Sequence, residues 1–203
     1  MKRVFDFIAA SAGLLFLSPI MLCAALMIKL DSRGPVFFKQ ERVGKNFRPF
    51  LIYKFRTMVV HAQLKGSLIT FSDDPRITRA GHFLRKAKID ELPQLINVLK
   101  GDMSLVGPRP EVPRYVEMFR KDYDEILTVR PGITDLASLK YRDEAAVLAA
   151  TKDPEWEYVA SVMPEKIRLA KQYIREASFL FDLKLILRTL FKIIVYEKAK
   201  LAA

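Results

Sequence analysis

The stretch FIAASAGLLFLSPIMLCAALMI, residues 7–28, decides the fold, because none of its 22 residues carries a charge. A helix of this length is roughly 33 Å long, enough to cross the hydrocarbon core of a bilayer. A cleaved signal peptide fits poorly, because Asp6 interrupts its start and no small-residue cleavage site follows. A lipoprotein signal fits poorly too, because Leu22 rather than a small residue precedes Cys23. The stretch therefore predicts a membrane helix.

Both flanks of this helix are basic, and residues 29–60 hold eight Lys/Arg against two Asp/Glu. Since basic flanks stay on the cytoplasmic side of a membrane, both ends favour the same side. In the middle of the helix, Pro19 removes a hydrogen bond and bends the axis, while Ser18 can bond a freed carbonyl. These features favour a kinked, re-entrant helix over residues 1–30; a plain spanning helix is the alternative.

The composition limits the classes of function. The 203 residues are 51% hydrophobic, and the formal net charge is +11. Such a chain folds, and its charge favours anionic partners: nucleic acid, an anionic membrane surface or phosphorylated substrates. Cys23 is the single cysteine, which excludes an internal disulfide, and His61 and His82 are too few for a zinc site. For a bound metal, oxygen ligands and Mg²⁺ are the better expectation.

Residues 31–203 are predicted to form one cytoplasmic, membrane-associated domain of the α+β class, mostly helical. Residues 36–56 predict a short β-hairpin, because aromatic and β-branched residues flank a Gly-Lys-Asn turn at 44–46. The other predicted elements are a short basic helix leading to Asp90, helices over 91–100, about 113–128 and 143–176 (broken at Asp153-Pro154 and restarted at Pro164), a loop over 101–110, and a turn at 130–134.

The last predicted helix covers residues 179–195. Lys184, Arg188 and Lys192 recur at every fourth position, and Leu, Phe and Ile occupy the rest of the surface. This pattern is typical of a basic amphipathic helix in a membrane interface. A core helix with one solvated stripe fits the pattern equally well.

Asp90 and Glu91 form an acidic pair in a basic chain, followed by a glycine- and proline-rich loop that carries Arg109. A helix start explains the pair by itself, because acids are favourable at the N-cap and in the first turn. Alternatively, the pair does chemistry on a phosphate. Arg85 and Arg109 would then bind the phosphate through forked hydrogen bonds.

The sequence contains no G-x-G-x-x-G, no P-loop and no G-x-S-x-G, which excludes the ordinary dinucleotide, P-loop and nucleophile-elbow sites. The aromatic and basic residues of the 36–56 hairpin are the one candidate nucleic-acid surface, and they suit a membrane-proximal surface equally well. A non-catalytic, membrane-anchored basic adaptor is a further alternative.

The stretch DPRITRAGHFLRKAKIDELPQLINVLKGDMSLVGPRPE, residues 74–111, resembles the bacterial sugar transferases, the monotopic phosphoglycosyl transferases, in their minimal catalytic form. Four more stretches match in the same order: KRVFDFIAASAGLLFLSPI (2–20), GPVFFKQERVGKNFRPFLIYKFRTM (34–58), VRPGIT (129–134) and SFLFDLKLILRTL (178–190). The resemblance covers most of the chain, and its central part is long and specific.

The resemblance implies a transferase that moves a sugar-1-phosphate from a nucleotide diphosphate sugar, commonly a UDP-sugar, to a polyprenyl phosphate such as undecaprenyl phosphate. UMP would be released, and the reaction would be the first membrane step of glycoconjugate or polysaccharide assembly. The expected location is the cytoplasmic face of the bacterial inner membrane. Within the family pattern, Asp90 is the nucleophile that forms a covalent phosphosugar intermediate, and Glu91 is its partner. Mg²⁺ is required, with Asp90 as a ligand, and Ser18-Pro19 matches the break in the re-entrant helix.

The match weakens after VRPGIT. Many members continue with Gly-Trp-Ala-Gln-Val, whereas this chain continues with DLASLKYRDEAAVLAATKDPEWEY (135–158). This departure leaves the expected chemistry in place and the identity of the sugar open. Arg130, Lys140 and Arg142 are candidates for contact with a substrate phosphate, and a solvated charged turn is the equal alternative.

Overall fold

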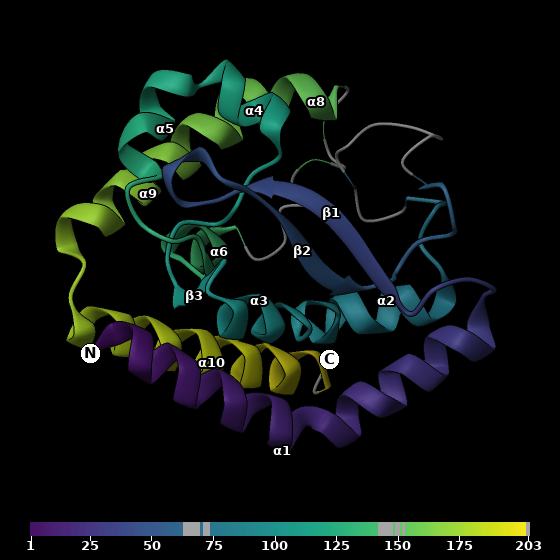
Figure 1. Ribbon diagram of the computed structural model, residues 1–203. Coiled ribbons are helices and arrows are strands. Elements are labelled where there is room, and N and C mark those ends of the chain that lie inside the picture. Colours follow the sequence, from purple (N-terminus) through teal and green to yellow (C-terminus); the bar gives the residue numbers. More distant parts are fainter. Residues whose placement is uncertain (63–69, 71–73, 142–147, 149–150, 152, 202–203) are drawn as a thin grey trace.

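The computed structural model describes residues 1–62, 70, 74–141, 148, 151 and 153–201 (Figure 1). In chain order its elements are α1 (Lys2–Asp31), β1 (Phe37–Val43), β2 (Pro49–Phe55), α2 (Arg79–Lys86), α3 (Gln94–Lys100), β3 (Ser104–Val106), α4 (Pro113–Met118), α5 (Arg120–Ile126), β4 (Gly132–Thr134), α6 (Leu136–Lys140), α8 (Pro154–Glu157), α9 (Met163–Glu176) and α10 (Phe179–Leu201). The structure is mostly helical with a short antiparallel hairpin, which confirms the predicted class.

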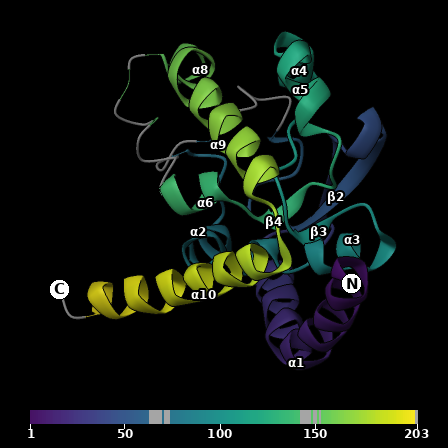
Figure 2. The ribbon, with the colours of Figure 1, turned by 90° about the vertical axis from the view of Figure 1, so that its left-hand side faces the viewer.

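Helix α1 bends in its middle, so that both of its ends turn toward the rest of the protein (Figures 1 and 2). Pro19 has no N–H to donate to the carbonyl of Leu15, four residues earlier, and this oxygen accepts from Ser18 Oγ instead, at 2.7 Å. The predicted role of Ser18 at the bend is confirmed. By length and composition α1 is able to cross a membrane, with a mean hydropathy of 2.2 over its most apolar part.

Each end of α1 is bonded to the remainder of the fold. Near its start, the buried carboxylate of Asp6 accepts from Ser104 Oγ at 2.8 Å and from the Leu105 N–H at 3.2 Å. At its end, Asp31 accepts from the backbone N–H of Ala80 at 3.1 Å. The two arms of α1 are therefore docked onto one folded body.

Helices α1 and α10 lie on the same side of the protein, opposite α4, α5, α8 and α9 (Figure 1). They meet at their N-terminal ends, where the Phe5 and Phe179 rings pack edge to face at 5.3 Å. Both helices expose large apolar side chains: Val4, Phe7, Ile8, Leu15, Phe16, Ile20, Leu22, Leu26, Met27 and Leu30 of α1, and Phe179, Leu180, Leu183, Leu187, Leu190 and Phe191 of α10. This side of the protein is therefore an extended apolar surface.

Strands β1 and β2 form the predicted hairpin, with a register from Phe37↔Phe55 to Val43↔Pro49. The turn contains a 3₁₀ segment, Lys45–Phe47, in which Asn46 adopts φ 55°. Asn tolerates this left-handed conformation better than most residues, which explains its place in the turn.

The helix predicted over 91–100 begins only at Gln94, so this boundary was wrong. The acidic pair instead lies on a separate 3₁₀ turn, Ile89–Glu91, which follows Lys88 in the left-handed conformation (φ 57°). Pro93 between the turn and α3 has no N–H, so it interrupts the hydrogen-bond ladder there.

Three other predictions need correction. The helix expected over 113–128 is split into α4 and α5 at Phe119, whose backbone leaves the helical region (φ −114°, ψ 34°). The loop expected over 101–110 and the turn expected over 130–134 contribute β3 and β4, which pair in parallel. That pairing joins segments far apart in sequence, and no local pattern indicates it.

The helical region predicted over 143–176 falls partly on residues 142–147, 149–150 and 152, outside the described residues. Asp153 caps α8 by accepting from Glu155 and Trp156 N–H groups, which confirms the predicted break. The predicted restart at Pro164 is wrong, because a π-helical turn, Tyr158–Val162, connects α8 directly to α9. Pro164 lies in the first turn of α9, where a backbone N–H has no acceptor within the helix. A proline therefore costs no hydrogen bond at this position.

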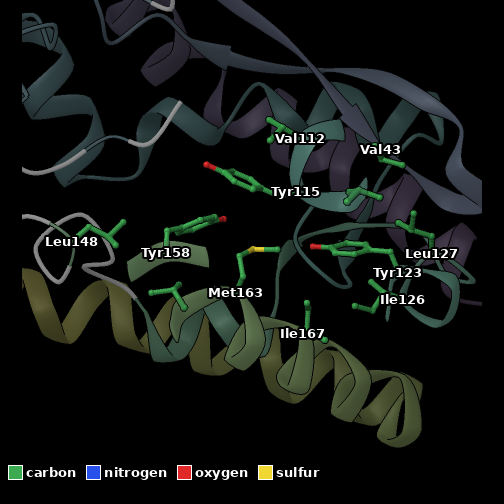
Figure 3. Close-up of a cluster of buried hydrophobic side chains, with 12 residues drawn as sticks. Val43, Val112, Tyr115, Tyr123, Ile126, Leu127, Leu148, Tyr158, Met163 and Ile167 are labelled. Carbon is green, nitrogen blue, oxygen red and sulfur yellow. The ribbon is translucent and has the colours of Figure 1, made fainter. Parts of the chain in front are cut away.

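Among the described residues, the largest buried cluster lies between α4, α5, the π-helical turn and α9, and includes Val43 at the end of β1 (Figure 3). In Figure 3 the hydroxyl groups of Tyr123 and Tyr158 both point toward its centre, where Met163 lies. This core holds the helices that follow the Pro-Arg-Pro loop against the hairpin.

Candidate active site

The two acidic side chains of the dyad occupy contrasting environments. Glu91 accepts from Lys54 Nζ at 2.8 Å and forms a two-pronged ion pair with the guanidinium of Arg109. Burial by itself would raise its pKa, but Arg109 and Lys54 together hold the pKa of Glu91 well below its usual range. Glu91 is therefore an ionised carboxylate whose hydrogen-bonding capacity is used by the protein.

Asp90 is only 8% exposed, and within the described chain its Oδ1 atom has no hydrogen-bond partner. Burial, and then repulsion by Glu91, raise the pKa of Asp90, while Lys54 and Arg85 act in the opposite direction. Such a carboxylate is poorly stabilised by the protein alone, which makes it reactive toward an electrophile or a cation.

The cations of the site come from three different segments. Lys54 is on β2, and burial is the main cause that lowers its pKa. Arg85, in the last turn of α2, donates from Nε to Thr57 Oγ1 at 2.9 Å and attracts Asp90 electrostatically. Arg109 follows β3. The structure thus brings together the four residues Arg85, Asp90, Glu91 and Arg109 that the sequence singled out.

The loop that carries Arg109 is held by a close crossing of two backbones. Gly107 N donates to the Thr134 carbonyl at 3.1 Å, and Gly132 N donates to the Pro108 carbonyl at 2.9 Å. A Cβ atom on Gly107 would lie 2.4 Å from the Arg130 backbone oxygen, so a larger residue would force the segments apart. Glycine at this crossing therefore fixes the base of the loop.

A buried ionic cluster holds the other side of this loop. Glu111 accepts from Tyr158 Oη at 2.8 Å and lies 3.4 Å from an Arg42 nitrogen and 3.6 Å from Lys166 Nζ. Burial acts to raise the pKa of Glu111, but Lys166 and Arg42 lower it more, so the carboxylate stays charged. Glu111 thereby bonds the hairpin and the helical core to the end of the loop that carries Arg109.

Asn97 anchors α3, the helix after the dyad, to strand β2. Its side-chain Oδ1 accepts from the Tyr53 N–H at 3.0 Å, and Nδ2 donates to the Leu51 carbonyl at 2.7 Å. The fully buried amide thus pairs with the strand edge as another strand would. Because Lys54 is the next residue on that strand, this contact sets its position relative to the dyad.

The donor set suits a magnesium ion that is shared with a substrate. Within the residues described, no three His, Cys, Asp or Glu side chains converge on one point. Mg²⁺ commonly uses one or two carboxylates together with substrate phosphates and water. The unpaired Oδ1 of buried Asp90 fits this arrangement.

Sequence reasoning missed Lys54 and Glu111, because their places near the dyad and its loop depend on packing between distant segments. Of the three further candidates for substrate contact, two bond to other parts of the described structure. Arg130 donates to the Gly101 carbonyl at 2.8 Å, Lys140 pairs with Glu165 at 2.6 Å, and Arg142 lies outside the described residues.

Comparison with known proteins gives several relatives. UDP-glucose:undecaprenyl-phosphate glucose-1-phosphate transferase of Escherichia coli (strain K12) is 38% identical over 203 residues, which are 98% of this chain and 41% of that protein. The protein with the same name from Caulobacter vibrioides is 39% identical over 203 residues, with 98% of this chain and 71% of that protein covered. UDP-N-acetylgalactosamine-undecaprenyl-phosphate N-acetylgalactosaminephosphotransferase of Aeromonas hydrophila is 48% identical over 141 residues, 68% of this chain and 33% of that protein.

The chain thus spans less than half of the length of the Escherichia coli and Aeromonas relatives. The family description "Bacterial sugar transferase" fits residues 1–196, which include the bent helix, the dyad and the Pro-Arg-Pro loop. By this match and by its relatives, the chain belongs to the bacterial sugar transferase family.

Proposed function

We propose that this protein transfers a sugar-1-phosphate from a UDP-sugar to undecaprenyl phosphate through a covalent intermediate on Asp90. A carboxylate oxygen of Asp90 attacks the sugar-bearing phosphorus, the phosphorus–oxygen bond to UMP breaks, and UMP leaves with the bonding electron pair. A phosphate oxygen of undecaprenyl phosphate then attacks the same phosphorus. The bond to Asp90 breaks, the carboxylate is restored, and the lipid diphosphate sugar is released.

The observation that carries this proposal is the asymmetry of the dyad. Glu91 is bonded to two cations, whereas buried Asp90 keeps an oxygen without a partner among the described residues. A nucleophile needs such an available oxygen, and a charge-setting partner does not. The names of the relatives supply the donor and acceptor classes, UDP-sugars and undecaprenyl phosphate.

Cations around Asp90 would reduce the repulsion between its carboxylate and the diphosphate of the substrate. Lys54 and Arg85 attract Asp90 electrostatically, and the side chain of Arg109 is 29% exposed to solvent. Arg85 and Arg109 bind the diphosphate in this proposal and stabilise charge that develops on it. Mg²⁺, held by Asp90 and the diphosphate, would supply further neutralisation of that charge.

The proposed location is the cytoplasmic face of the bacterial inner membrane, with residues 1–30 as a re-entrant helix. Both ends of α1 bond to the same folded body, at Asp6 and Asp31, and the bend lies between them. The exposed apolar faces of α1 and α10 lie on one side of that body and would contact the lipid. This placement brings the dyad within reach of a lipid-linked phosphate.

Intact mass of the purified protein in nanodiscs tests the chemistry. Wild-type protein with Mg²⁺ and UDP-glucose or UDP-N-acetylgalactosamine should gain the mass of one sugar phosphate, and undecaprenyl phosphate should discharge it. Asp90→Asn should gain nothing under the same conditions. A wild-type protein that releases UMP in the presence of acceptor but never carries an adduct would contradict the covalent route.

Cysteine labelling tests the topology. After Cys23→Ser, a cysteine added at either chain end should react with an impermeant reagent only from the cytoplasmic side. Labelling of the two ends from opposite sides would replace the re-entrant helix with a spanning one.

A further inference from the structure

The buried side chain of Gln94, the first residue of α3, is a second unsatisfied group close to the dyad in sequence. It is 1% exposed, and neither Oε1 nor Nε2 has a hydrogen-bond partner in the described part of the chain. An amide buried without partners destabilises a fold, so packing normally avoids it. By contrast, the amide of Asn97, three residues later on the same helix, accepts from the Tyr53 N–H and donates to the Leu51 carbonyl and to Asp102 Oδ2.

The position of Gln94 relates it to Asp90. Residues three and four apart share one face of a helical segment, and helical side chains lean toward the N-terminal end. Gln94 follows Glu91 by three positions and Asp90 by four, and Leu92 and Pro93 between them have helical backbone angles, so the spacing places Gln94 on the face of the dyad turn. Because the oxygens of Glu91 are bonded to Lys54 and Arg109, the buried groups of this face without a partner among the described residues are Asp90 Oδ1 and the Gln94 amide.

The chemistry of this face favours a phosphoryl ligand. Lys54, Arg85 and Lys88 each act on Asp90 as positive charges, so an anion is attracted to it. An amide N–H₂ group donates two hydrogen bonds and adds no charge, which suits the non-bridging oxygens of a phosphate already opposed to a carboxylate.

We propose that Gln94 is a substrate-contacting residue whose Nε2 donates to a non-bridging oxygen of the phosphoryl group that is transferred to Asp90. This inference rests on the proposed function and adds to it a specific contact that is made when the phosphorus approaches the nucleophile. The contact explains why the fold keeps an amide there at a cost in stability.

The test uses Gln94→Met, which keeps the size of the side chain and removes its polar atoms. The full-length protein in nanodiscs is mixed with Mg²⁺ and UDP-glucose or UDP-N-acetylgalactosamine, and the rate of adduct formation is measured by rapid-quench intact mass. We expect this rate to fall about 10- to 100-fold while the thermal unfolding midpoint stays unchanged or rises. Asn97→Leu is the matched control, and its midpoint should fall, because it removes an amide that is paired.

Gln94→Glu then tests which atom makes the contact, because it keeps an acceptor and removes the donor. We expect adduct formation as slow as in Gln94→Met or slower, and a wild-type rate would overturn the assignment to Nε2. A wild-type rate in Gln94→Met, or a slow rate with a midpoint lowered by several degrees, would overturn the substrate contact and leave the covalent route intact. No adduct on the wild-type protein with any UDP-sugar would instead refute the covalent route, and this inference with it.

Discussion

The start and the middle of helix α3 differ in how their buried polar side chains are bonded. At the start and in the turn before it, the Gln94 amide and Asp90 Oδ1 lack partners among the described residues. In the middle of the helix, Asn97 bonds to the backbone of Leu51 and Tyr53. An unpaired buried polar group destabilises by about 1–3 kcal/mol, so this short segment both gains and loses stability from its side chains. The unpaired groups bind the substrate in our proposal, and the paired amide of Asn97 fixes the geometry.

The same contrast distinguishes the two members of the dyad, Asp90 and Glu91. Glu91 has its charge balanced by Lys54 and Arg109, and its pKa is low, whereas Asp90 is buried beside it with a raised pKa. Two adjacent carboxylates thus reach different protonation equilibria, because their side chains point to different surroundings. A single substitution tests each side of this comparison.

After the complete loss of adduct expected for Asp90→Asn, Glu91→Gln should have the largest effect. The amide cannot form ion pairs with Lys54 and Arg109, so we expect the transfer rate to fall about 10³-fold. Burial already lowers the pKa of Lys54 and Glu91 opposes this, so removal of Glu91 should lower that pKa further and move the alkaline limb of the pH–rate profile to lower pH. The exposed Glu41→Gln on β1 is the control. An unmoved alkaline limb would contradict a role for Glu91 in setting the charge of Lys54.

Asn97→Leu should have the next largest effect, which is a loss of stability. It leaves the Leu51 carbonyl and the Tyr53 N–H without their side-chain partner, which should reduce the free energy of unfolding by about 3 kcal/mol. The thermal unfolding midpoint in nanodiscs measures this loss, and Gln94→Met provides the comparison. Equal midpoints for the two variants would remove the distinction between the paired amide of Asn97 and the unpaired amide of Gln94.

Asp90→Asn should raise stability in a pH-dependent way. The folded pKa of Asp90 lies above its ordinary value of 3.8, so the folded state binds its proton more tightly than the unfolded state. The wild type therefore loses stability as pH rises through that raised pKa, and the asparagine variant does not. Unfolding midpoints measured from pH 4 to pH 8 should diverge with rising pH. A constant difference would show that Asp90 titrates normally.

Ser18→Ala should have the smallest effect. It removes the hydrogen bond to the Leu15 carbonyl that Pro19 leaves open, which is worth about 0.5 kcal/mol in a membrane environment. We expect a small decrease in the unfolding midpoint with the bend retained, since Pro19 causes it. Ser11→Ala on the same helix is the control, and equal midpoints would mean that the Ser18 bond contributes nothing measurable.

Local chemistry explains what could be predicted. The bend at Ser18-Pro19 follows from a missing N–H, and the hairpin follows from a Gly-Lys-Asn turn between aromatic strands. The dyad and its two arginines stand out because an acidic pair is unusual in so basic a chain and a stiff Pro-Arg-Pro loop follows it. The start of α3 was misplaced by three residues, because a 3₁₀ turn and an α-helix have similar sequence patterns.

The sequence by itself determined the apolar helix with its bend, the helical class and the candidates Asp90, Glu91, Arg85 and Arg109, because each depends on neighbouring residues. Only the tertiary structure decided that Lys54 and Arg109 bind Glu91, that Asn97 completes the edge of β2, and that Asp90 Oδ1 and the Gln94 amide have no partner among the described residues. The physical reason is distance along the chain. A hydrogen bond or ion pair between residues dozens of positions apart depends on the packing of whole elements, which no local pattern specifies.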